Sequence, residues 1–134
     1  MEDVSFSYRA KEEIISKINS KPKADVCMMG MLTYCNCLSD DEISFLTENK
    51  AVADFFVLNT GRITGNENAV LVTEQKKRNG VVLYALDIPE REDRLTLLDY
   101  FRMDKSRRLE EADLPKEKFY PQLVAGIFLA CGSV

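Results

Sequence analysis

The chain has 134 residues, which is enough for one domain with a hydrophobic core. Its net charge is −4 and its pI is about 5.0, so the overall charge does not indicate a dedicated nucleic-acid-binding domain. The absence of histidine excludes histidine-based catalysis and histidine-ligated metal sites.

Membrane insertion and secretion are not indicated either. No apolar run approaches the roughly 20 residues that a transmembrane helix needs, and the charged opening MEDVSFSYRAKEE is unlike a signal peptide. We therefore expect a cytoplasmic protein, in which the four cysteines stay reduced. These cysteines show no repeated CxxC spacing, so we expect buried small side chains and neither a metal site nor a cofactor.

Two helices are predicted in the first 36 residues. Residues 7–19 carry apolar side chains at helical spacing, with Ser7 as a candidate N-cap. Pro22 ends this helix or restarts the next one. Residues 24–36 form the second predicted helix, in which Gly30 lies among apolar residues.

A short hairpin over 36–47 follows, with a turn signal at Ser39-Asp40-Asp41. Asn49 is a candidate N-cap for a helix over 50–60, and Gly61 is its expected end.

The second half of the chain predicts strands over 68–74 and 81–86, joined by a hairpin turn at Asn79-Gly80. A helix over about 91–103, a charged linker over about 104–118 and a last helix over 119–131 complete the order. This order, ααββαββα and one more helix, indicates a single α+β domain in which an antiparallel sheet packs on helices.

Two segments resemble each other: MMGMLTYCN at 28–36 and VAGIFLACG at 124–132. Each has glycine in its third place, Gly30 and Gly126. Glycine in a helix costs about 1 kcal/mol relative to alanine, but it lets two helices approach closer than the usual 8–10 Å. We therefore expect the two helices to pack through Gly30, Tyr34, Cys35, Ala125, Gly126, Ala130 and Gly132.

This pattern resembles the paired motif helices of the LAGLIDADG family, in which each motif helix is followed by a hairpin, a helix and more strands. Three further stretches are similar to bacterial WhiA proteins: SFSYRAKEEI at 5–14, TENKAVA at 47–53 and AGIFLACGSV at 125–134. The three lie in the order that the WhiA family has.

The resemblance implies a catalytically inactive, LAGLIDADG-like scaffold and interaction domain. It is the N-terminal part of DNA-binding transcription regulators linked to sporulation, cell division and chromosome segregation in bacteria, where the location is the nucleoid. It also implies that the chain is cut just after its second motif helix, 119–134, and that the C-terminal helix-turn-helix lies outside it.

The resemblance also argues against nuclease activity. Active LAGLIDADG enzymes carry a metal-binding acid in the eighth place of each motif, where this chain has Cys35 and Cys131. A neutral thiol is a poor ligand for Mg²⁺, which prefers oxygen. Packing of the motif helices would bring the two cysteines near each other. Asp40 and Asp41 are conceivable substitute acids, although a solvated turn explains them more simply.

DNA contacts by this part of the protein are expected to be weak or absent, because the predicted strands contain no Lys or Arg. The candidate phosphate contacts are Lys76, Lys77 and Arg78 at a hairpin tip, and Arg62 before it. A solvated turn is the alternative interpretation of the tip.

Two other hypotheses remain open on the sequence. The chain is a degenerate LAGLIDADG nuclease, or it is a small protein-binding or ligand-binding α+β module unrelated to DNA. The apolar segment 119–134 also suggests a homodimer or a swap between two copies.

Overall fold

The computed structural model describes residues 6–33, 37–101 and 117–131. Its elements confirm the predicted α+β class with an antiparallel sheet. In chain order they are α1 (Phe6–Ser16), α2 (Lys21–Thr33), β1 (Cys37–Leu38), β2 (Ile43–Thr47), α3 (Lys50–Thr64), β3 (Leu71–Lys76), β4 (Val82–Asp87), α4 (Arg91–Tyr100), the 3-10 turn η2 (Glu117–Phe119) and α5 (Tyr120–Cys131).

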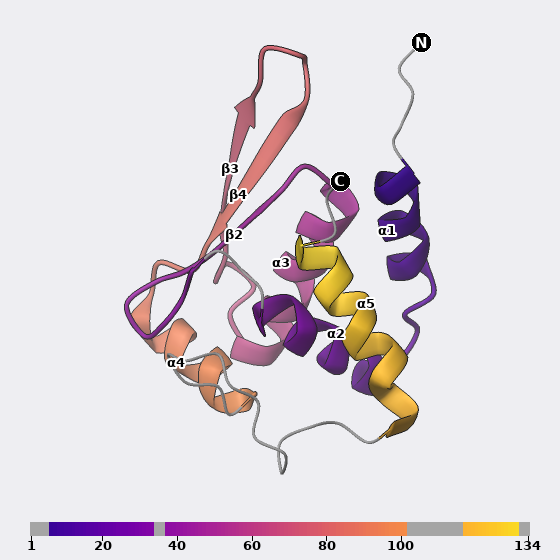
Figure 1. Cartoon of the computed structure of the whole chain (residues 1–134). Helices are drawn as coiled ribbons and strands as arrows, with labels where there is room; N and C mark the ends of the chain where they lie inside the picture. Colours follow the sequence, from indigo (N-terminus) through magenta and orange to yellow (C-terminus); the bar gives the residue numbers. More distant parts are fainter. Residues whose placement is uncertain (1–5, 34–36, 102–116, 132–134) are drawn as a thin grey trace.

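The strands form one antiparallel sheet in the order β1-β2-β4-β3. The registers pair Phe45 of β2 with Leu86 of β4, and Thr73 of β3 with Ala85 of β4. Every residue of β3 is exposed, since β3 and β4 form a ribbon that extends past the helices (Figure 1). Within these two strands, Leu86 near the end of β4 is the one fully buried residue, so the ribbon contributes little to the core.

The turn of this ribbon lies where Asn79-Gly80 predicts it. Gly80 adopts φ = 83°, a backbone conformation that glycine adopts without steric cost. The Asn79 side chain accepts a hydrogen bond from the Val81 amide at 3.0 Å, and the Lys77 amide donates to the Val81 carbonyl at 2.8 Å. Residues 78–80 therefore lie between the bonded pair Lys77 and Val81, a common hairpin geometry with glycine in the left-handed position.

The core lies between the sheet and the helices. Phe45 of β2 stacks on Phe56 of α3, with ring centroids 5.4 Å apart. Fully buried residues from α2, α4 and α5 complete the same cluster, among them Met28, Leu97 and Leu129. Figure 1 shows α5 beside α2, and this pair has the most extensive contact between any two helices of the described residues. No helix in the described ranges has the length and apolar character needed to cross a bilayer.

The boundaries of α3 confirm one prediction and correct another. Asn49 is the N-cap: its side chain accepts a hydrogen bond from the Val52 amide at 3.2 Å and donates one to the Tyr8 carbonyl. Gly61 does not end the helix, because its backbone stays helical and the helix continues to Thr64. Gly65 ends it instead, with φ = 75° and its amide bonded to the Gly61 carbonyl.

Other boundaries also differ from the predictions. Helix α1 begins at Phe6, so Ser7 lies within the first turn and is not the N-cap. Helix α2 begins at Lys21, three residues before the predicted start, because Pro22 is compatible with a first helical turn that needs no amide donor. Most of the predicted linker over about 104–118 lies outside the described residues, which omit 102–116.

Candidate functional site

The crossing of α2 and α5 brings Gly30 and Gly126 together. A Cβ atom on Gly30 would meet the Leu123 carbonyl oxygen and lie 2.9 Å from the Ile127 nitrogen. A Cβ atom on Gly126 would meet the Cys27 carbonyl oxygen and lie 2.9 Å from the Cys27 carbonyl carbon. The two backbones are therefore in direct contact, and the absence of a side chain at both glycines makes this approach possible.

Small residues and a buried thiol surround this crossing. Ala130 packs against the core, and Ala125 is partly buried on the same helix. Cys27 is fully buried, as we expect for the cysteines of this chain, and this burial raises the pKa of its thiol from 9.0 to about 12. The thiol is therefore neutral at physiological pH, which suits packing and not metal binding.

Several predicted motif positions fall outside the described residues. They are Tyr34, Cys35 and Gly132, together with the side chain of Cys131. The expected approach of Cys35 and Cys131 therefore stays a prediction. Within the described ranges, no group of three or more Cys, Asp or Glu residues is arranged to hold a metal ion.

Asp40 and Asp41, the conceivable substitute acids, belong to the turn between β1 and β2. The Asp40 carbonyl accepts a hydrogen bond from the Arg94 guanidinium at 2.8 Å, and the Asp40 carboxylate lies 3.7 Å from the Arg91 guanidinium. The Asp41 amide donates to the Ser39 hydroxyl at 3.2 Å. These contacts fasten the turn to the start of α4, which is a structural role.

At the hairpin tip, the three basic residues differ in their surroundings. Lys77 forms an ion pair with Glu48, which precedes α3. Arg78 is exposed in the turn, and Lys76 is exposed at the end of β3. Because β3 extends to Lys76, the expectation that the strands carry no Lys or Arg is wrong by this one residue. Glu74 in the same strand offsets that charge.

Arg62 is engaged inside the molecule. Its guanidinium donates to Asp25 at 2.6 Å and to Asn59 at 3.0 and 3.2 Å, while the Tyr100 hydroxyl donates to the other oxygen of Asp25 at 2.6 Å. Burial lowers the pKa of Arg62, but the hydrogen bond to Asp25 and the negative charge of Asp25 have the larger combined effect, so the pKa of Arg62 is raised. Burial and the Asp25 hydrogen bond raise the pKa of Tyr100. The cluster ties α2, α3 and α4 together.

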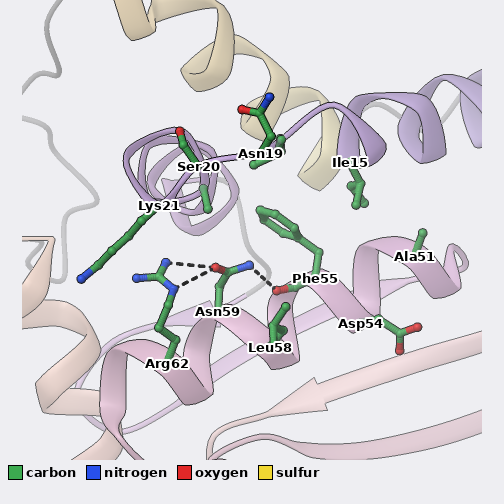
Figure 2. A pocket seen from close by; sticks show the side chains of 12 residues that line it. Ile15, Asn19, Ser20, Lys21, Ala51, Asp54, Phe55, Leu58, Asn59 and Arg62 are labelled. Carbon is green, nitrogen blue, oxygen red and sulfur yellow. Dashed lines mark hydrogen bonds between the residues drawn. The ribbon is translucent and has the colours of Figure 1, made fainter.

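A groove of about 670 Å³ runs between α3 and the connection from α1 to α2 (Figure 2). Its apolar lining includes Ile15, Ile18 and Phe55, and Leu58 forms its outer edge. Polar groups stand at its ends, and these include Lys21, Asp54, Asn59 and Arg62. A second hollow of about 450 Å³ lies on the other side of Leu58, lined by Val57, Gly61 and Glu67. Neither hollow was predicted, since Leu58 lies off the apolar stripe that marks the buried face of α3.

Comparisons with protein-family models, with curated proteins and with solved structures found no match to this chain.

Proposed function

We propose that this chain is a catalytically inactive, LAGLIDADG-like scaffold and interaction domain, the N-terminal part of a WhiA-type bacterial transcription regulator. The observation that carries the proposal is the crossing of α2 and α5. Gly30 and Gly126 occupy the same place in two similar segments, and each glycine is in contact with the backbone of the opposite helix. Paired glycine-bearing helices are the structural centre of the LAGLIDADG arrangement that the sequence resembles.

The order of elements between the two helices supports the same proposal. After α2 the chain forms the hairpin β1–β2, helix α3, the hairpin β3–β4 and helix α4 before it reaches α5. One LAGLIDADG unit has a hairpin, a helix and more strands after its motif helix, in the same order. The antiparallel sheet, in the order β1-β2-β4-β3, is compatible with such a unit.

The charges of this region favour a scaffold over a DNA-reading surface. Lys76 is the one Lys or Arg within the four strands of the described sheet. The sheet also carries two acidic residues, Glu74 in β3 and Asp87 in β4. Lys77 and Arg62 are paired with Glu48 and Asp25. Phosphate contacts depend on accessible cations, so we assign DNA binding to another segment of the proposed regulator. The roles that we propose for this regulator are in sporulation, cell division and chromosome segregation.

A salt titration of the chain against a generic fluorescent DNA duplex tests whether this region binds DNA. We expect weak anisotropy changes at low salt, and the Lys76→Ala/Lys77→Ala/Arg78→Ala variant should behave like the unmodified chain. Tight binding with a steep salt dependence that the triple variant loses would place DNA contacts on the hairpin tip and contradict the assignment.

A plasmid-cleavage assay with Mg²⁺ or Mn²⁺ tests the absence of catalysis. We expect no metal-dependent nicking by the chain. Cleavage that disappears in Asp40→Ala or Asp41→Ala would show that the turn supplies catalytic acids, and the scaffold proposal would then be wrong.

A further inference from the structure

The outer face of α3 carries a ridge of three side chains at i, i+4 spacing: Asp54, Leu58 and Arg62. Leu58 is the most exposed large hydrophobic residue of the described chain, with 71% of its surface accessible. The groove over Phe55 lies on one side of this ridge, and the hollow over Val57 lies on the other. This face thus presents a ridge with a groove on each side.

Such a face is complementary to a copy of itself. When i±4 ridges of two helices interdigitate, the helices cross at about −50°, the commonest class in globular proteins. A twofold axis near Leu58 would place each Leu58 in the other copy's groove, over Phe55, Ile15 and Ile18. A contact of this kind is isologous, because the same surface is used by both copies.

The charges of the ridge are arranged symmetrically about Leu58. Asp54 and Arg62 each lie four residues from it, about 6 Å along the helix axis. In an antiparallel crossing, Asp54 of one copy would therefore approach the end of the groove that holds Arg62 and Lys21 of the other (Figure 2).

Lys21 is the better partner for Asp54 across the axis. It forms no ion pair within the described part of the chain, whereas Arg62 already holds Asp25. Asp54 itself has a highly exposed pair with Lys50, which is easily exchanged. Glu67, beyond the ridge, lines the second hollow and not the groove.

We infer that this face, formed by α3 and the connection from α1 to α2, is an interface between two copies of this chain. The occupant of the groove is Leu58 of the second copy. An unrelated helix could also fill an apolar groove, but a second copy in addition brings Asp54 of each chain to the groove end that holds Lys21 of the other. One leucine ridge per copy is a small anchor compared with a standard interface of about 800 Å² per partner, so we expect a weak dimer.

Sedimentation equilibrium of the full chain over micromolar to submillimolar concentrations tests the inference. We expect a monomer–dimer equilibrium that Leu58→Glu weakens about tenfold or more, because the variant removes the central anchor and buries a charge. Two matched controls introduce the same charge on other exposed apolar residues: Leu71→Glu on β3, 56% exposed, and Val124→Glu on α5, 64% exposed. Both controls should dimerise like the unmodified chain.

Charge reversal gives a second, more specific readout. Asp54→Lys and Lys21→Asp should each weaken the dimer, and the double variant should regain most of the affinity, because the pair is restored across the axis. Under mild oxidation, Leu58→Cys should form a disulfide-linked dimer faster than Leu71→Cys or the unmodified chain, since a residue near the twofold axis lies close to the same residue of the second copy.

Several results would overturn the inference. These are a monomer over the whole concentration range, a dimer that Leu58→Glu does not weaken, or a double charge reversal that rescues nothing. A dimer dissociated by Val124→Glu alone would place the interface on α5, as the segment 119–134 suggests from its sequence. Circular dichroism of each variant establishes that it remains folded.

Discussion

Substitution of Gly126 by alanine is expected to destabilise the protein, although alanine is the better helix former. In an isolated helix the change would stabilise by about 1 kcal/mol. Here the new methyl group would meet the Cys27 carbonyl oxygen and lie 2.9 Å from its carbonyl carbon and 3.1 Å from its Cα. These are backbone atoms of a packed helix, so α5 has to move away from α2.

The size of the effect follows from two opposing contributions. Inserting an extra methyl group into a tightly packed region typically costs about 1–3 kcal/mol, and here the neighbour is rigid backbone, which favours the upper part of that range. After subtraction of the helix-propensity gain, we expect a net loss of about 1–2 kcal/mol. Separation of the helices also loosens the contacts of Leu129, which is 1% exposed.

Urea unfolding followed by circular dichroism measures this loss. With a slope of about 2 kcal/mol per molar urea, the midpoint should fall by about 0.5–1 M. Val124→Ala is the matched control, since it introduces the same residue on the exposed side of the same helix and should change stability by less than about 0.5 kcal/mol. Gly30→Ala combined with Gly126→Ala should cost less than the sum of both, because either one opens the same interface. An unchanged or raised midpoint for Gly126→Ala would refute the close-contact reasoning.

Two further predictions concern local structure. Asn49→Ala removes the cap bond to the Val52 amide and the bond to the Tyr8 carbonyl, and should lower unfolding free energy by about 1–2 kcal/mol in the same urea assay; a loss near zero would contradict the capping role. Because burial raises the pKa of Cys27 to about 12 from 9.0, the unfolded state releases the thiol proton first and stability falls as pH rises through this range. Between pH 8 and pH 10 the unmodified chain should lose about 1.4 kcal/mol more than Cys27→Ala, and equal losses would show that the thiol is not desolvated.

Local patterns in the sequence were sufficient where a single residue type determines the backbone. Asn79-Gly80 predicts the hairpin because glycine adopts the positive φ that the turn needs, and Asn49 predicts the start of α3 because its side chain caps the first amides. The same logic misplaces the end of α3, since Gly61 and Gly65 both follow an apolar stretch. Only the tertiary structure shows that Gly61 lets the backbone of Glu67 pack closely against α3, where the Glu67 Cα would lie 3.2 Å from an added Cβ. Gly65 is the residue that takes the left-handed conformation.

Features that depend on distant residues left no local signal. Asp25 lies 37 residues from Arg62 and 75 from Tyr100, so no spacing pattern predicts that they form one cluster. Sequence comparison of the two glycine segments predicts that α2 and α5 can pack, but it cannot tell contact within one chain from contact between two copies. The described structure has α5 packed on α2 of the same chain, and a swap through 119–134 would have to displace this contact.

Chromatin immunoprecipitation of the natural protein, tagged in its own cells, tests the central claim most directly. If this region is the scaffold that we propose, the protein should be enriched at a limited set of chromosomal sites, and the Lys76→Ala/Lys77→Ala/Arg78→Ala variant should keep the same sites. A uniform background signal for the unmodified protein would contradict the account and favour a protein-binding or ligand-binding module without a DNA role.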